Sequence, residues 1–118
     1  MDQTEFVFLY STFPDTAAAE AVGRLLVGQG LAACVNIYPA MTSIYMWEGR
    51  TERAAEAAAF IKTRRALVDD VIAAARPHHP YAVPCFLVLP ISGGNEDYLA
   101  WAREQTDRAT RNVGSGGV

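Results

Sequence analysis

A long strand pair is predicted from residues 31–49, which read LAACVNIYPAMTSIYMWEG. Side chains alternate in polarity on both sides of Pro39, as they do along a half-buried β-strand. Proline has no N–H group to donate to a neighbouring strand, so Pro39 predicts an edge, a bulge or a bend. Glu48 and Gly49 then indicate a tight turn. The chain is therefore expected to reverse at Gly49 and to pair the long strand with the segment that follows.

That following segment, residues 51–76, is ambiguous. Its richness in Ala, Glu and Arg favours one long helix by intrinsic propensity. Phe60-Ile61-Lys62-Thr63, however, is typical of the end of a strand, and Thr63 could cap a separate helix over residues 67–75. The hairpin signal at Gly49 slightly favours strand then helix, and the residues alone leave both alternatives open.

The flanking segments complete an α+β pattern. Two further strands and two further helices are expected, at residues 6–10 and 83–89 and at residues 16–28 and from 94 or 95 onward. Asp15 can cap the first of these helices. The resulting order, βαββαβ followed by a helix, is that of a ferredoxin-like sandwich with an added C-terminal helix. We expect a single domain over residues 1–110 and a flexible tail over residues 111–118.

The composition is that of a mildly acidic globular domain. The chain has 118 residues, a formal net charge of −3, 51% hydrophobic residues and a single lysine among its ten basic residues. No basic patch or block of like charge indicates a nucleic-acid or membrane partner. No basic start followed by an apolar run marks a secretory signal, and no apolar stretch is long enough to cross a membrane. We therefore expect a cytoplasmic protein whose Cys34 and Cys85 are free thiols.

The chain's histidines, His78 and His79, are adjacent and lie between Pro77 and Pro80. Two imidazoles in a stiff loop could ligate copper or zinc, although such a pair is more often structural. Cys85 is a possible soft ligand or nucleophile, but its apolar neighbours favour a buried, inert thiol. Three glutamates are expected to form a solvated face rather than a catalytic pair: Glu48, Glu52 and Glu56. No nucleophile and base stand out as a pair, so an enzyme is not expected.

Large aromatic side chains are numerous for so small a domain, and two of them predict an interface. Tyr45 and Trp47 share one face of their strand, and Ile44 and Met46 share the other. A two-layer sandwich buries only one face of its sheet, so rings on the second face need cover, for which another subunit is the natural source. The sequence therefore predicts an oligomer.

Several short motifs occur in an order that resembles one known family. They are Leu31-Ala32-Ala33-Cys34-Val35-Asn36, residues 42–49, Ile61-Lys62-Thr63, His79-Pro80-Tyr81-Ala82-Val83-Pro84, Leu89-Pro90-Ile91 and residues 97–101. Together they strongly resemble the CutA family of divalent-cation tolerance proteins. The resemblance implies a ferredoxin-like subunit in a homotrimer that exchanges long strands around its threefold axis, similar in architecture to the PII signalling proteins. It also implies strand then helix over residues 51–76, tolerance of copper and other divalent cations, and no organic cofactor.

The resemblance implies a metal site as well. The copper site proposed for bacterial members combines a Cys after the first strand with two adjacent His. Here the His positions are His78 and His79, and the Cys position is Ser11, whose hydroxyl is a much poorer soft ligand. Where the family commonly has two glutamates, this chain has Ala82 and Cys85, so Cys85 is a possible additional ligand.

The resemblance also implies an aromatic-walled pocket with one cation in the cleft between subunits, formed by Tyr45, Trp47, Lys62 and Tyr81. The sequence is therefore compatible with three functions. The first is a cytoplasmic homotrimer that binds divalent copper weakly at His78 and His79. The second is a PII-like sensor whose anionic small-molecule ligand lies against Lys62, Tyr45 and Trp47. The third is a scaffold trimer without a ligand.

Overall fold

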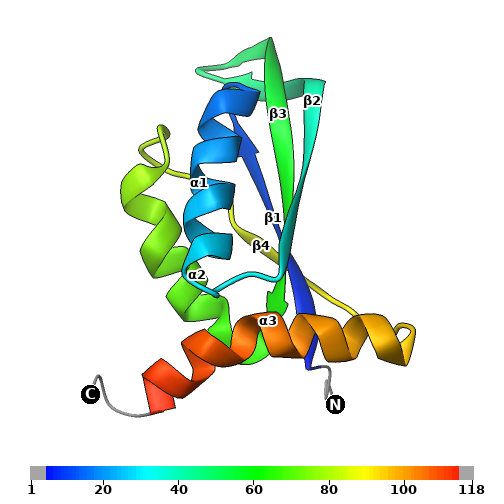
Figure 1. The fold of residues 1–118 in the computed structure, drawn as a ribbon. Helices are drawn as coiled ribbons and strands as arrows, with labels where there is room; N and C mark the ends of the chain where they lie inside the picture. Colours follow the sequence, from blue (N-terminus) through cyan, green and yellow to red (C-terminus); the bar gives the residue numbers. More distant parts are fainter. Residues whose placement is uncertain (1–4, 115–118) are drawn as a thin grey trace.

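Residues 5–114, the part of the chain that the computed structural model describes, fold into a four-stranded antiparallel sheet and three α-helices (Figure 1). Side chains are described over residues 5–107. The elements are β1 (Phe6–Phe13), α1 (Thr16–Gly28), β2 (Cys34–Trp47), β3 (Arg50–Arg64), the 3₁₀ turn Arg65–Leu67, α2 (Val68–Ala75), the 3₁₀ turn Arg76–His78, β4 (Leu87–Pro90) and α3 (Glu96–Gly114). The strands lie in the order β2-β3-β1-β4. α1 and α2 lie together on one face of the sheet, and α3 crosses one end of it (Figure 1).

Residues 51–76 divide into strand and helix, the alternative that the hairpin signal favoured. β3 lies between β2 and β1 and pairs with both. The three alanines at residues 57–59 are buried in this strand although alanine favours helices, because pairing on both sides outweighs a small intrinsic propensity. The helix cap predicted at Thr63 is wrong. Its buried hydroxyl donates to the carbonyl oxygen of Leu31 at 2.6 Å, and α2 begins only at Val68.

The turn between β2 and β3 has the predicted position. Glu48 and Gly49 both have positive φ, 49° and 77°, which is the geometry of a type I′ hairpin turn. The register of β2 shifts between Tyr38 and Met41, so the irregularity predicted at Pro39 is confirmed. Beyond this shift β2 and β3 pair with each other alone, and the hairpin projects past the other strands (Figure 1). The radius of gyration, 15.3 Å, accordingly exceeds the roughly 13 Å of a compact chain of this length.

The main hydrophobic core lies between the sheet and helices α1 and α2. Leu9 of β1 is fully buried there beside Leu26 of α1 and Val71 of α2. The predicted cap of α1 is confirmed, because the Asp15 carboxylate accepts a hydrogen bond from the backbone N–H of Ala18 at 2.8 Å. α3 packs through a smaller apolar cluster at the end of the sheet near the start of β1.

Two boundaries differ from those expected. β4 covers only Leu87–Pro90 instead of residues 83–89, because Pro84 interrupts the segment and cannot donate to a ladder. α3 extends to Gly114, so residues 111–114 are helical, and residues 115–118, the rest of the predicted tail, lie outside the described part. Within the described residues, no helix is both long and apolar enough to cross a membrane.

A network of ion pairs holds α3 against the sheet. Arg64, at the end of β3, donates to the Thr106 hydroxyl at 2.9 Å and to the Asp107 carboxylate. Glu5 lies 3.5 Å from the Arg64 guanidinium and accepts from Arg103 of α3 at 2.9 Å. Only 15% of the Arg64 side chain is exposed, so its pairs are less screened by water than surface pairs are. The network therefore fixes where α3 crosses the sheet.

Candidate functional site: a buried histidine and a lysine-lined pocket

His79, the second of the adjacent histidines, is buried beside the end of β1. Its ring stacks on Phe13 with the ring centroids 4.3 Å apart. Its Nε2 lies 3.0 Å from the carbonyl oxygen of Thr12, and its Nδ1 lies 3.2 Å from the backbone nitrogen of Tyr81. A carbonyl only accepts and a backbone N–H only donates. The two partners therefore require a neutral ring with its proton on Nε2 and its lone pair on Nδ1.

We expect acid to destabilise the fold through His79. Burial lowers the pKa of His79 below its usual 6.5, and the hydrogen bond to Thr12 opposes this effect in part. Just below pH 6.5 the unfolded chain therefore binds a proton that the folded chain does not. The free energy of unfolding should decrease as the pH falls through this window, by at most about 1.4 kcal/mol per pH unit, and be independent of His79 above it. Urea unfolding across pH 5 to 8 measures the slope, which His79→Gln should reduce. An unchanged slope in that variant would contradict the assignment.

The other residues predicted to bind metal differ in their burial and in their contact with His79. Ser11 is fully buried with its Oγ 3.4 Å from His79 Nε2, so the family's Cys position does lie next to the second histidine. His78 is exposed in the 3₁₀ turn after α2. Cys85 is a free, half-buried thiol whose pKa is raised by burial and by the charge of Glu56, which disfavours the thiolate that binds metals. Among the residues that the structure describes, no three His, Cys, Asp or Glu side chains converge to hold a metal ion.

Tyr81 and Glu56 form a second polar contact beside His79. The Tyr81 hydroxyl donates to the Glu56 carboxylate at 2.6 Å, and the rings of Tyr81 and His79 are 5.3 Å apart. Burial, this hydrogen bond and the charge of Glu56 raise the pKa of Tyr81, and Tyr45 and Asp15 act in the same direction. Sequence reasoning placed Glu56 on a solvated face. It missed this contact because no local pattern links residues that lie 25 positions apart.

The structure separates Lys62 from this region within one chain. Tyr45 pairs with Glu52 of β3, and Lys62 lies ten residues farther along that strand, a distance of roughly 33 Å. Trp47 lies at the hairpin tip, where it pairs with Arg50. The subunit-cleft pocket expected from these residues and Tyr81 is therefore not formed by a single chain and would need two subunits.

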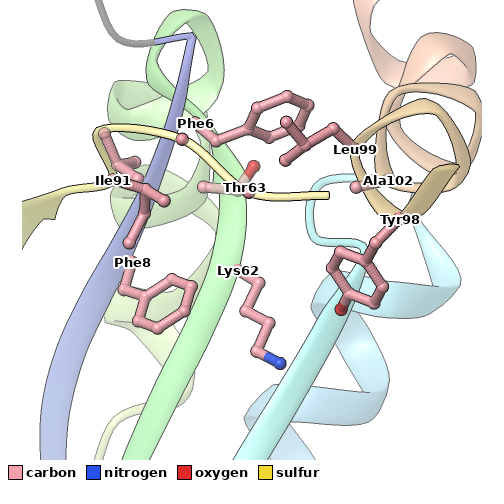
Figure 2. Close-up of a pocket in the computed structure, with 11 residues that line it drawn as sticks. Phe6, Phe8, Lys62, Thr63, Ile91, Tyr98, Leu99 and Ala102 are labelled. Carbon is pink, nitrogen blue, oxygen red and sulfur yellow. The ribbon is translucent and has the colours of Figure 1, made fainter. Parts of the chain in front are cut away.

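Lys62 instead lines a pocket of about 180 Å³ between β1, β3 and α3 (Figure 2). Its side chain extends between the rings of Phe8 and Tyr98, with Nζ 5.7 Å and 5.5 Å from their centroids. Phe6 and Leu99 belong to the apolar part of the wall. Sequence reasoning did not find this pocket, because its walls come from β1, β3, α3 and the segment between β4 and α3, most of which are far apart in the chain.

Three features together define a class of small α+β proteins. They are the antiparallel sheet, the projecting hairpin of β2 and β3, and the turn that carries His78 and His79 beside β1. Comparison with known families identifies that class. The model of the CutA1 divalent ion tolerance protein matches residues 7–105, and the chain belongs to this family, as its motifs predicted. The family description concerns tolerance of divalent ions rather than catalysis of a reaction.

Curated relatives agree with this assignment. Protein CutA 1, chloroplastic, of Oryza sativa is 39% identical over 100 residues, which are 85% of this chain and 56% of the rice protein. The divalent-cation tolerance protein CutA of Salmonella newport is 38% identical over 97 residues, 82% of this chain and 84% of its own length. The chain spans little more than half the length of its rice, Arabidopsis thaliana and Homo sapiens relatives.

Solved structures show the same fold. CutA from Xylella fastidiosa superposes with a TM-score of 0.85 at 35% identity and covers 88% of this chain and 100% of that one. The periplasmic divalent cation tolerance protein CutA from Archaeoglobus fulgidus gives a TM-score of 0.82 at 37% identity and covers 86% and 98%.

The prediction of a cytoplasmic location is wrong as an inference from this sequence. Relatives with the same domain are described as chloroplastic in rice and Arabidopsis thaliana and as periplasmic in Archaeoglobus fulgidus. The charge, length and hydropathy that suggested the cytoplasm are properties of the domain, and the domain occurs in several compartments.

Proposed function

We propose that this chain is the ferredoxin-like subunit of a homotrimer that contributes to divalent-cation tolerance by binding copper or a similar ion at His78 and His79. The observation that carries cation binding is the pair of hydrogen-bond partners of the His79 ring, the Thr12 carbonyl at Nε2 and the Tyr81 backbone nitrogen at Nδ1. Membership of the CutA1 family supports the link to divalent ions, and the strand order β2-β3-β1-β4 supports the ferredoxin-like description. The resemblance to the CutA family supplies the number of three subunits.

The hairpin supports assembly. Its outer part is two-stranded, and an isolated two-stranded hairpin is marginally stable in water. Ile44, Met46 and Trp47 expose 71%, 69% and 61% of their surface there. β4 is exposed along its whole length, although three of its four residues are Leu, Val and Leu. Apolar surface of this extent would be stabilised by contact with neighbouring subunits.

The His79 ring supports cation binding. Metals bind the neutral imidazole, and the second ring nitrogen of a metal ligand usually donates to a carbonyl or carboxylate. In His79 the Nε2–H already donates to Thr12, and Nδ1 keeps its lone pair. An ion at Nδ1 would replace one hydrogen bond from the Tyr81 backbone, which makes the proposed site weak. His78, two residues before Pro80, is exposed and free to turn toward that ion.

Copper(II) titration of the purified full chain tests this function, with the mass in solution recorded by light scattering. We expect the mass of a trimer, one ion per subunit, and affinity at least about tenfold lower in the His78→Gln, His79→Gln double variant. Affinity should also fall below about pH 6 as the imidazoles are protonated. Cys85→Ser decides whether the predicted third ligand takes part, since unchanged affinity excludes it. Copper binding by the double variant at wild-type affinity would refute the site.

A PII-like sensor or scaffold trimer is the second candidate. Tyr45 and Trp47 are exposed at the hairpin tip, where a neighbouring subunit could bring them to another chain's Lys62. A thermal-shift screen of nucleotides and organic acids tests this candidate, because its hits should be lost in Tyr45→Ala and in Lys62→Ala. If no compound changed the melting temperature, the scaffold trimer without a ligand would be the remaining form of this candidate.

A further inference from the structure

We propose that α3 is a strap that opens away from the sheet as one unit when the ionic strength rises, while β1, β3, α1 and α2 stay folded. Arg64, at the end of β3, is the side chain that holds this strap closed. The inference depends neither on cation binding nor on a ligand between subunits, because the contacts that carry it lie within one chain.

α3 contributes little apolar surface to the interior of the subunit. Of its side chains that the structure describes, those of residues 96–107, only Ala102 and Thr106 are buried. Ala102 and the partly buried Leu99 pack against the small cluster around Phe6, which is separate from the main core between the sheet and helices α1 and α2. One methyl group and part of one leucine supply little hydrophobic stabilisation. Polar contacts therefore carry much of the docking of α3.

Arg64 supplies the polar contacts that hold α3. Its guanidinium donates to the Thr106 hydroxyl at 2.9 Å, to the Arg103 carbonyl oxygen at 3.0 Å and to the Asp107 carboxylate. These acceptors span residues 103–107, which is more than one turn of the helix. Hydrogen bonds between a cation and a carboxylate are about twice as strong as neutral ones. Because one side chain makes all three contacts, they are lost together, and α3 should open as a unit instead of fraying residue by residue.

The outer ion pairs make this docking sensitive to ionic strength. Glu5 lies 3.5 Å from the Arg64 guanidinium and 2.9 Å from that of Arg103, and Glu96 lies 3.3 Å from Arg103. The Glu5 and Glu96 side chains are 41% and 79% exposed. Salt screens such pairs, since the Debye length falls from about 10 Å at 0.1 M to about 3 Å at 1 M. The main core consists of apolar side chains, so raised salt should loosen α3 before it affects the rest of the fold.

Opening of α3 would change the surroundings of Lys62 and of the apolar end of the sheet. The Lys62 side chain extends between the Phe8 ring of β1 and the Tyr98 ring of α3 (Figure 2). An open α3 would take away the ring of Tyr98 and leave that of Phe8 in place. It would also expose Phe6 and Ala33, which are buried while the strap is closed. Lys62, the single lysine of the chain, can therefore report the state of the strap.

Hydrogen exchange of the assembled full chain, in 0.05 M and 1 M NaCl, tests the strap. In 1 M NaCl the amides of residues 99–107 should exchange at least about threefold faster, and those of β1 and β3 at an unchanged rate. Arg64→Met should accelerate exchange of α3 at least about tenfold already at low salt. Asp107→Asn, which keeps an acceptor without the charge, should have a smaller effect. Arg24→Met removes the same charge from an exposed pair with Glu20 and should have none.

The lysine signal of protein labelled with ¹³Cε-lysine gives a second readout. It should move in 1 M NaCl and in Arg64→Met in the direction that Tyr98→Leu moves it, and stay in place in Arg24→Met.

Three results would overturn the proposal. The first is exchange of α3 at the rate of β3 at both salt concentrations. The second is an Arg64→Met variant whose α3 exchanges like the wild type, or whose β1 and β3 accelerate as much as α3. The third is exchange of α3 that slows as the protein concentration rises, because a neighbouring subunit, and not Arg64, would then hold the helix.

Discussion

His79→Ala is expected to destabilise the subunit by about 3 kcal/mol. The ring is buried, stacks on Phe13 at 4.3 Å and bonds two backbone groups, the carbonyl of Thr12 and the N–H of Tyr81. Alanine would leave both groups without their partner and a cavity beside Phe13. An unsatisfied buried polar group costs about 1–3 kcal/mol, and the lost packing adds to that cost. Urea unfolding at pH 7.5, at one protein concentration for all variants, measures the loss.

Two matched variants separate the causes of that loss. His78→Ala removes the same side chain from an exposed position and should change the free energy of unfolding by less than about 0.5 kcal/mol. His79→Gln retains an N–H that can still reach the Thr12 carbonyl and should recover part of the stability. If His79→Ala cost no more than His78→Ala, the buried position of this ring would be wrong.

Much of the fold could be predicted because its decisive signals are local. The turn at Glu48 and Gly49 and the cap at Asp15 depend on residues within one turn of each other, and both occur where expected. Residues 50–64 form a strand although their alanine-rich composition favours a helix, because pairing with two neighbouring strands stabilises the strand. The prediction for Thr63 was wrong for the same reason. Its hydroxyl, which would suit a helix cap, instead donates a hydrogen bond to the carbonyl oxygen of Leu31, 32 positions away.

The candidate sites were less predictable because tertiary contacts create them. The sequence singled out the adjacent histidines, but only the fold distinguishes the buried ring of His79 from the exposed ring of His78. Lys62 was assigned to a pocket between subunits together with hairpin residues, and that pocket stays a prediction. Within one chain the strand register places Lys62 far from those residues and beside Tyr98. Register and helix placement depend on the whole sheet, which no short motif encodes.

Ser11→Cys is expected to raise copper(I) affinity by at least about tenfold, which tests the departure of this chain from the family pattern. The Ser11 Oγ lies 3.4 Å from His79 Nε2, so a thiolate at this position and the imidazole could both reach one ion. Thiolates are soft ligands that select copper(I), whereas a hydroxyl is not. Nε2 must give up the Thr12 carbonyl to bind there, so the gain should be smaller than a free cysteine–histidine pair would give.

Competition with a chromophoric copper(I) chelator, without oxygen and under reducing conditions, measures this gain. Ser11→Ala controls for the loss of the hydroxyl and should leave the affinity at the wild-type value. In the Ser11→Cys, His79→Gln double variant the gain should disappear, because the ion then lacks its nitrogen ligand. A gain that survived in the double variant would show that the thiol binds copper without His79. The close approach of position 11 to His79 would then have no role in holding the ion, and His79 would be left with the structural role that its burial and its two backbone hydrogen bonds already give it.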